Sequence, residues 1–479
     1  MTGERGSTGF SHDEEAGTRG LSLKGRDIMP TAPDRRTIGT WGFFMISVAM
    51  YVQLVSFIAG SQVYPALSPI TILITVIVGN IVVWALLVLT GDIGLKHGVP
   101  FAVYARAPFG YLGAHIPALV RALPALFWFG FQTWLAAQAL NIIMETLTGY
   151  SNLTLLIVVF GAFQILNTAL GIEAIAIFDW VATPVLLTTG IIMEIALLRR
   201  YDIGFSELFS TQGEGGISFL AAVAIMAGAQ ITMAVNISDI PRSLRADRGS
   251  TWARRNRGSA IAQFFGLVPP MAMFVIVGMT SGLATGEWNP ILVMADVFGG
   301  NTLLLVLVLG SFVIFAQVAS NTGQNLLPPG YVFVNLFPRK ITFPVAVIAA
   351  GVVGLVITPW NFAEYIPTIL LIISALLGPI VGILVSDYYL IRRTNVNVRD
   401  LYEAGGQYRY WNNFNPAALI VYFVSAAVGI LIPDFSFFVA LVVSFFAYYA
   451  LMKFWILRRY PQSEVEAEET APTTDRVSV

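Results

Sequence analysis

Long apolar stretches separated by short polar segments recur along almost the whole chain. A helix needs about 20 apolar residues to cross the hydrocarbon core of a bilayer. Stretches of that kind lie at about 40–62, 68–90, 113–144, 152–170, 173–198, 216–239, 259–282, 299–326, 341–358, 364–391, 415–432 and 435–457. The pattern predicts an all-α polytopic membrane protein with about 12 transmembrane helices.

Lysine and arginine fall almost entirely on one side of this arrangement. They are frequent in the N-terminal tail, after even-numbered stretches and at the C-terminal end, whereas the connections after odd-numbered stretches hold only Arg199 and Arg200. Basic residues mark the cytoplasmic side of a membrane protein. We therefore expect a multi-pass protein of the cell membrane with both termini cytoplasmic and polar, disordered tails at 1–37 and 460–479.

Composition excludes several other classes of protein. The chain has 479 residues, of which 56% are hydrophobic and 11% charged, against about 25% charged residues in a soluble domain. The net charge of −1 gives no electrostatic reason for a nucleic-acid partner. The sequence has no cysteine and three scattered histidines, and it shows no phosphate-binding loop or catalytic triad order. We therefore expect neither an enzyme nor a resident cofactor.

Two glutamines, Gln53 and Gln230, lie in the middle of the first and the sixth apolar stretch. An amide deep in hydrocarbon is costly unless a partner satisfies it, so such positions are candidates for function. Transporters built from two five-helix repeats place their interrupted, substrate-facing helices at these two positions.

The third stretch carries aromatic and amide side chains at helical spacing. Trp128 and Gln132 are four residues apart, so they lie on one face of a helix, and Gln138 and Asn141 follow. An indole beside an amide suits a planar ligand with N–H and C=O edges. The alternative is that Trp128 and its neighbours only pack or lie at the lipid interface.

The eighth stretch ends in an unusually polar segment, residues 320–325, closed by Pro328 and Pro329. Hydroxyls and carbonyls in such a segment can replace the water around a small cation. They can equally well hydrogen-bond neighbouring helices, and the residues alone leave both interpretations open.

Few carboxylates lie within the stretches. Asp239 and Asp387 have arginines close in sequence, which favours an ion pair or a role at a helix end. Glu173 and Glu194 lie in the fifth stretch, where a buried carboxyl can carry protons.

Five segments together resemble the nucleobase:cation symporter-1 family, in register from about Arg36 to Arg459. They are FWFGFQTW (127–134), EWNP (287–290), SNTGQNLLPPGY (320–331), LGPIVGILVSDYYLIRR (377–393) and DLYEAGGQYRYWNNFN (400–415). The resemblance implies a leucine-transporter-type fold. It implies a ten-helix transport core at 38–392, with inverted repeats at about 38–200 and 214–392 and broken first and sixth spans. Two accessory helices would follow at 393–459.

The resemblance also implies a site for a planar nitrogen heterocycle imported with a cation by alternating access. Trp128 matches the stacking indole, Gln132 and Asn325 match amides that bond the ring, and Gln53 matches a polar residue of span one. Gln230 stands where the family has a second stacking tryptophan, and Ala229 stands where it has a glycine. A one-sided stack plus an amide favours allantoin or a nucleobase such as uracil over hydantoins with large aromatic substituents.

The sodium site of the family matches only in part. Its backbone ligands fall at Ala49, Val52 and Ala316, whereas its two hydroxyl positions fall at Ala319 and Ser320. One hydroxyl is therefore missing, and co-transport of Na⁺ or of H⁺ stays open. The alternatives are a cytosine/purine-type permease with proton coupling, a passive facilitator of the same substrates, and a sensor of them.

Overall fold

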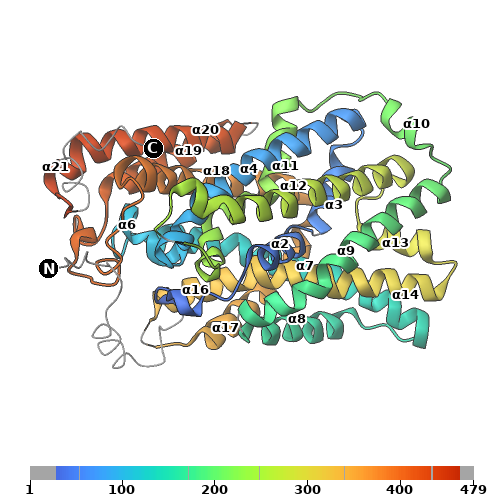
Figure 1. Ribbon diagram of the computed structural model, residues 1–479. Coiled ribbons are helices and arrows are strands. Elements are labelled where there is room, and N and C mark those ends of the chain that lie inside the picture. The colour runs from blue at the N-terminus through green and yellow to red at the C-terminus, as the bar shows by residue number, and fades with distance from the viewer. Residues whose placement is uncertain are drawn as a thin grey trace.

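The computed structural model describes residues 28–52, 54–170, 172–247, 249–338, 340–432 and 435–463. Across these residues the secondary structure is helical, and β-type pairing is confined to two isolated bridges. Most of the long helices run roughly along one common direction, and the described chain begins and ends toward the same end of the bundle (Figure 1). We refer to this end as the terminus end.

Each apolar stretch of the sequence forms a helix or a series of consecutive helices. The first half contains α2 (Thr40–Tyr51), α3 (Leu54–Val63), α4 (Pro69–His97), α7 (His115–Thr148), α8 (Leu153–Ala169), α9 (Ile172–Arg200) and α11 (Phe219–Asn236). The second half contains α12 (Trp252–Thr285), α14 (Thr302–Ser311), η5 (Phe312–Gln317), α15 (Val318–Asn321), η6 (Thr322–Leu326), α16 (Leu327–Leu336), α17 (Phe343–Val356), α18 (Ile366–Val385), η8 (Ser386–Ile391), α19 (Pro416–Leu431) and α20 (Ser436–Leu451).

Several of these helices are long enough to cross a membrane. Among the described residues, six helices are long and apolar enough, and the number rises to eight when each of two bent pairs is one span. The helices α8, α17 and α19 are apolar but shorter. The protein is therefore a multi-pass membrane protein, and the full number of twelve spans stays a prediction.

The first and the sixth span are both interrupted near their middle. The helices α2 and α3 meet at 51°, and the segments Phe219–Gly228 and Gln230–Ser243 meet at 54°. Gln53 lies outside the described residues, and so does the side chain of Ala229, so the structure does not test either assignment. Val52 has extended backbone angles at the end of α2, which ends the helix there and leaves carbonyl groups without helical partners.

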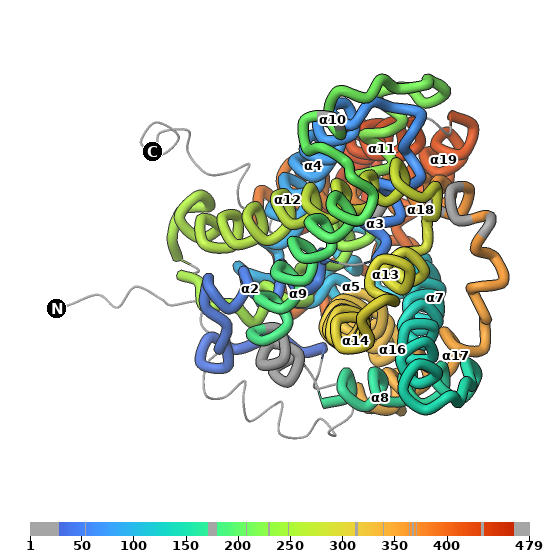
Figure 2. The backbone as a smooth tube through the Cα atoms, turned by 90° about the vertical axis from the view of Figure 1, so that its right-hand side faces the viewer, coloured from blue at the N-terminus to red at the C-terminus, as the bar shows by residue number. Residues whose placement is uncertain are grey.

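The long helices form two groups that meet around α2 and α7. The helices α3, α4, α11 and α12 pack together and are covered by α18, α19 and α20, whereas α7, α8, α16 and α17 form the second group. Figure 2 shows α4 and α12 well apart from α8 and α17. α2 and α7 carry several of the residues that the sequence analysis selects, among them Ala49, Trp128 and Gln132.

Backbones approach closely where α3 packs on α12. A Cβ added at Gly278 would overlap the carbonyl of Phe57, and one added at Gly60 would overlap the carbonyl of Val275. Small residues allow such approach in membrane bundles, where packing rather than the hydrophobic effect joins the helices. We call this pair of glycine positions the α3–α12 contact.

Buried ion pairs join helices at the terminus end. Asp92 of α4 accepts two hydrogen bonds from Arg255 of α12, at 2.6 and 2.8 Å. Asp387 of η8 pairs with Arg392 at 2.6 Å, and both side chains are fully buried. The ion pair expected for Asp387 is therefore present, and Asp239 has the helix-end role, since it accepts from the N–H of Phe101 at 2.8 Å.

Parts of both predicted tails are ordered. Arg36 is buried and donates to the Leu95 carbonyl at 2.6 Å, and Ile38 pairs with Leu244 in a parallel bridge. Gln462 is buried and accepts from Arg392 at 2.8 Å. Assigning all of 1–37 and 460–479 to disorder is therefore wrong for 28–37 and 460–463, because backbone carbonyls and an arginine satisfy these polar groups.

Candidate functional site

The third span presents Trp128 and Gln132 toward the interior of the bundle. Both are buried, with 7% and 1% of their surfaces exposed. The indole lies edge-on to Phe127 and Phe131, at ring-centroid distances of 5.5 and 5.7 Å. These contacts fix the ring, and the burial excludes a lipid-facing position for Trp128.

The eighth span is irregular where it faces this helix. The segments η5 and η6 are π-helical, a form that is frequent at functional sites. The Ser320 hydroxyl lies 2.6 Å from the Ala316 carbonyl and 3.2 Å from Gln132 Oε1, so its single proton has these two acceptors. The structure therefore brings Gln132 and Ser320 together.

Asn325 belongs to a second set of hydrogen bonds between the eighth span, α7 and α8. Its Nδ2 donates to Asn321 Oδ1 at 2.8 Å, and Asn321 in turn donates to the carbonyl of Phe129 at 3.1 Å and to Gln164 Oε1 at 2.9 Å. Gln164 donates to Thr133 Oγ1 at 2.9 Å. We call the residues of the two sets together the hydrogen-bonded wall; they are the pair Gln132 and Ser320 and the connected residues Thr133, Gln164, Asn321 and Asn325.

Gln230 lies at the break of the sixth span and is fully buried. Its Nε2 makes two long contacts, to the Tyr51 carbonyl at 3.4 Å and to Met271 Sδ at 3.5 Å. Its Oε1 has no hydrogen-bond partner among the described residues. A buried acceptor without a partner costs about 1–3 kcal/mol, so this amide gains when a ligand satisfies it. We call Tyr51 and Gln230 the broken-helix wall.

The residues expected around a cation are all buried where α2 meets the eighth span. Ala49, Val52, Ala316, Ala319 and Ser320 have no measurable exposure. A hydrogen bond from the amide of Gln324 to the Met50 carbonyl joins the two helices next to these positions. The oxygens available there are backbone carbonyls and one hydroxyl, a set that suits a hard cation such as Na⁺.

Three polar residues that face this region carry no assigned role in the sequence analysis. Arg121 of α7 is buried and bonds Asn236 Oδ1 at 2.7 Å and the Gln324 carbonyl at 3.1 Å. Gln164 completes the hydrogen-bonded wall. Both are lone polar groups in apolar stretches, the same signal that selected Gln53. Gln317 is fully buried, and neither atom of its amide has a partner among the described residues.

Glu194 of the fifth span is bonded to the seventh span and makes no bond to the hydrogen-bonded wall among the described residues. Glu194 of α9 accepts from the hydroxyl of Thr280 at 2.8 Å, and its second oxygen has no partner among the described residues. The side chain of Glu173 is outside the described residues. A proton-carrying role of either residue stays a prediction.

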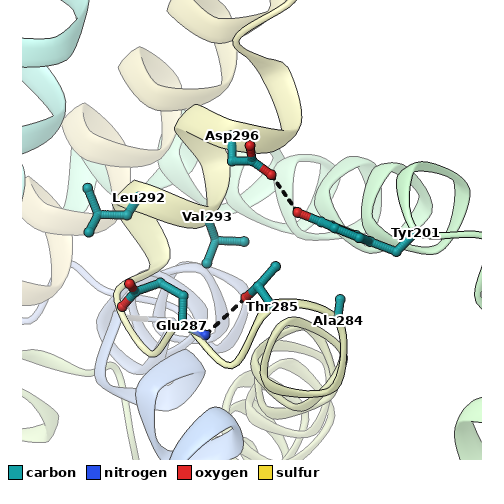
Figure 3. A pocket seen from close by; sticks show the side chains of 7 residues that line it. All are labelled: Tyr201, Ala284, Thr285, Glu287, Leu292, Val293 and Asp296. Carbon is teal, nitrogen blue, oxygen red and sulfur yellow. Dashed lines mark hydrogen bonds between the residues drawn. The ribbon is translucent and has the colours of Figure 1, made fainter.

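A separate pocket of about 330 Å³ lies away from these residues, at the ends of α9 and α12 and beside α13 (Pro290–Phe298). Tyr201 donates to Asp296 at 2.5 Å across it, and the N–H of Glu287 donates to Thr285 at 3.0 Å, as Figure 3 shows. None of the residues expected to bind the substrate or the cation lines this pocket.

Comparisons with known proteins identify the class. The sequence matches the family described as "Permease for cytosine/purines, uracil, thiamine, allantoin" over residues 30–457. It is 37% identical over 451 residues to the hydantoin permease of Microbacterium maritypicum, covering 93% of this chain and 92% of that protein. It is 28% identical to the allantoin permease of Bacillus subtilis (strain 168), with 90% and 93% covered.

Comparison of the fold with solved structures agrees with the comparison of sequences. The fold matches that of Mhp1, a nucleobase-cation-symport-1 family transporter, in a closed conformation with bromovinylhydantoin bound. The TM-score is 0.87 at 37% identity, with 93% of this chain and 99% of that chain covered. The protein is thus a membrane permease and not an enzyme. It belongs to the nucleobase:cation symporter-1 family, as the resemblance predicted.

Proposed function

We propose that the protein is a secondary active transporter that imports a planar nitrogen heterocycle together with a cation. The observation that supports this most directly is the arrangement of the two walls. A fixed indole and hydrogen-bonded amides lie on one side, and an incompletely satisfied amide lies at the helix break on the other. Trp128 would stack on the ring, and Gln132, Asn325, Gln53 and Gln230 would bond its edges beside Ala229.

The fold proposed for this activity has twelve spans. Inverted repeats at about 38–200 and 214–392 form the ten-helix core, and two accessory helices at 393–459 follow. The two bent helices occupy the first and sixth positions, as such repeats require. The basic connections support a cytoplasmic position for the terminus end. Alternating exposure of the site to the two sides of the membrane then moves the substrate inward.

The substrate that fits best is allantoin or a nucleobase such as uracil, and hydantoin is the next candidate. The Bacillus relative is an allantoin permease, and the Microbacterium relative is a hydantoin permease. Gln230 lies on the broken-helix wall with an unsatisfied oxygen, so a substrate with an additional N–H donor gains most there. The ureido group of allantoin supplies such a donor.

The coupling ion is proposed to be Na⁺, held by carbonyls of Ala49, Val52 and Ala316 and by the hydroxyl of Ser320. Each ligand then strengthens the binding of the other by linkage. The absent hydroxyl at Ala319 supports a second candidate function, a permease of the same substrates with H⁺ coupling. A passive facilitator is the remaining alternative.

Uptake of labelled allantoin, uracil, cytosine and hydantoin by cells that express the protein tests the proposal. We expect one of these to accumulate against its gradient and the accumulation to be lost when the sodium gradient is collapsed. If accumulation is lost only when the proton gradient is collapsed, the coupling ion is H⁺ and not Na⁺. Equilibration without accumulation would identify a facilitator, and transport of none of the four would contradict the proposal.

A further inference from the structure

The orientation of the Asn325 amide follows from a chain of hydrogen bonds that starts at a backbone carbonyl. A carbonyl oxygen can only accept a hydrogen bond. The carbonyl of Phe129 accepts from Asn321 Nδ2 at 3.1 Å. Asn321 therefore presents its NH₂ group to α7, and its oxygen must face the other way.

The same reasoning carries one step further along the chain. Asn321 Oδ1 lies 2.8 Å from the amide of Asn325, and an oxygen in that place accepts only from an NH₂ group. Asn325 therefore gives its NH₂ to Asn321. Turning the Asn325 amide over would put two carbonyl oxygens in contact and lose this bond.

Gln164 adds a second constraint on the orientation of the Asn321 amide. Its Oε1 accepts from Asn321 Nδ2 at 2.9 Å, and its Nε2 donates to Thr133 Oγ1 at 2.9 Å. Both Asn321 and Gln164 are fully buried, so water does not compete for these bonds. Reversing Asn321 would break its bonds to Phe129 and Gln164 together.

We propose that Asn321 is a positioning residue that makes Asn325 a hydrogen-bond acceptor for the substrate. Asn325 Oδ1 accepts no hydrogen bond from the described residues, and Asn325 keeps 5% of its surface exposed. Asn325 Oδ1 then requires an N–H group on the ring of the substrate. A substrate methylated at that nitrogen leaves the acceptor unpaired and is rejected. This inference rests on the proposed function, because it specifies the chemistry of the same site.

Competition by N-methylated rings tests the proposal. Uptake of labelled allantoin is measured in the presence of hydantoin, 1-methylhydantoin or 3-methylhydantoin. In the unmodified protein, one of the two methyl derivatives should compete at least about tenfold less well than hydantoin. In Asn321→Leu that difference should fall below about threefold, since Asn325 can then turn its NH₂ group to the ring.

The ratio between the two competitors distinguishes positioning from a general structural role. A variant that only damages the fold lowers uptake of every substrate and leaves the ratio unchanged. Asn80→Leu is the matched control, because Asn80 of α4 is equally buried and, among the described residues, bonds only the Val76 carbonyl of its own helix, at 2.8 Å. We expect this control to retain the tenfold difference.

Two results would overturn the inference while leaving the proposed function intact. One is an unmodified protein that accepts hydantoin and both methyl derivatives equally, and the other is an undiminished ratio in Asn321→Leu. If Asn321→Leu does not reach the membrane, Gln164→Leu replaces it; an intermediate ratio supports the inference and an unchanged ratio overturns it. Failure of allantoin uptake and of uracil, cytosine and hydantoin uptake would instead refute the proposed function.

Discussion

The two walls of the site differ in how completely their polar groups are bonded. In the hydrogen-bonded wall, the Asn321 amide donates to Phe129 at 3.1 Å and to Gln164 at 2.9 Å. It also accepts from Asn325 at 2.8 Å. In the broken-helix wall, Gln230 makes two long contacts and keeps an unsatisfied oxygen. The first wall is therefore pre-organised, whereas we expect the second wall to be completed by the substrate.

This difference assigns separate tasks to the two walls. A pre-organised group contributes affinity and selectivity without being reordered on binding. An amide that gains its partner from the ligand ties the position of its helix to the presence of the ligand, because only the occupied state satisfies it. We therefore expect selection of the substrate to depend on α7 and the eighth span, and the response to the substrate to depend on the bent helices.

Removal of the indole should have the largest effect. Trp128→Ala takes away the stacking surface on α7, beside the hydrogen-bonded wall, and stacking is worth about 1–3 kcal/mol for an aromatic base. We expect up to about a 100-fold rise in the substrate concentration for half-maximal uptake, with normal amounts of protein in the membrane. Trp134→Ala on the same helix is the control and should change this concentration by less than about threefold. Equal effects of the two substitutions would contradict the role of Trp128.

Removal of the Gln132 amide should have the second-largest effect on uptake. Gln132→Leu removes a ligand-facing amide and leaves the Ser320 hydroxyl without this acceptor, so we expect about a tenfold weaker apparent affinity. Gln138→Leu is the matched substitution on the same helix. Its amide bonds Asn289 at 3.1 Å, away from the wall, and apparent affinity should stay within about twofold. Uptake kinetics of both variants at saturating sodium give the comparison.

The same change, glutamine to leucine, should affect the free energy of unfolding differently in the two walls. Gln164→Leu removes the bond from Asn321 to Gln164 Oε1 and the bond from Gln164 to Thr133 Oγ1, and it should lower the free energy of unfolding by about 1–3 kcal/mol. Gln230→Leu removes an unsatisfied oxygen and should leave stability unchanged or raise it by about 1 kcal/mol. Thermal unfolding of the purified variants without substrate measures both. Equal destabilisation would show that the two walls do not differ.

The smallest effect is expected at the cation site. Ala319→Ser restores the second hydroxyl and should lower the sodium concentration for half-maximal uptake by about fivefold, equivalent to about 1 kcal/mol. Ala346→Ser in α17, equally buried, controls for adding a hydroxyl to a helix. A sodium dependence that does not change in Ala319→Ser, or that is absent throughout, would favour H⁺ coupling.

Much of the fold could be predicted because its signals are local. Every apolar stretch coincides with helix, since span length and hydropathy follow directly from bilayer thickness. The bent first and sixth spans were expected from Gln53, Gln230 and the family resemblance. The ordered parts of the tails at 28–37 and 460–463 could not be foreseen, because their polar side chains are satisfied by carbonyls and side chains far away in the sequence.

The site could be predicted as a set of residues but not as a network. Trp128, Gln132 and Asn325 are recognisable from residue type and motif. The role of Asn321 depends on the carbonyl of Phe129, 192 positions earlier in the chain. The role of Gln164 depends on the packing of α8 beside α7. Such pairings belong to tertiary structure, which hydrophobic periodicity does not encode.

The α3–α12 contact has a mechanical consequence. Since Gly60 and Gly278 leave no space between the two backbones, α3 cannot slide past α12 without atoms overlapping. The outer half of the first span should therefore travel with the seventh span as a single rigid body. Spin labels on these two helices should keep one narrow distance throughout the transport cycle, while distances from either helix to α7 change.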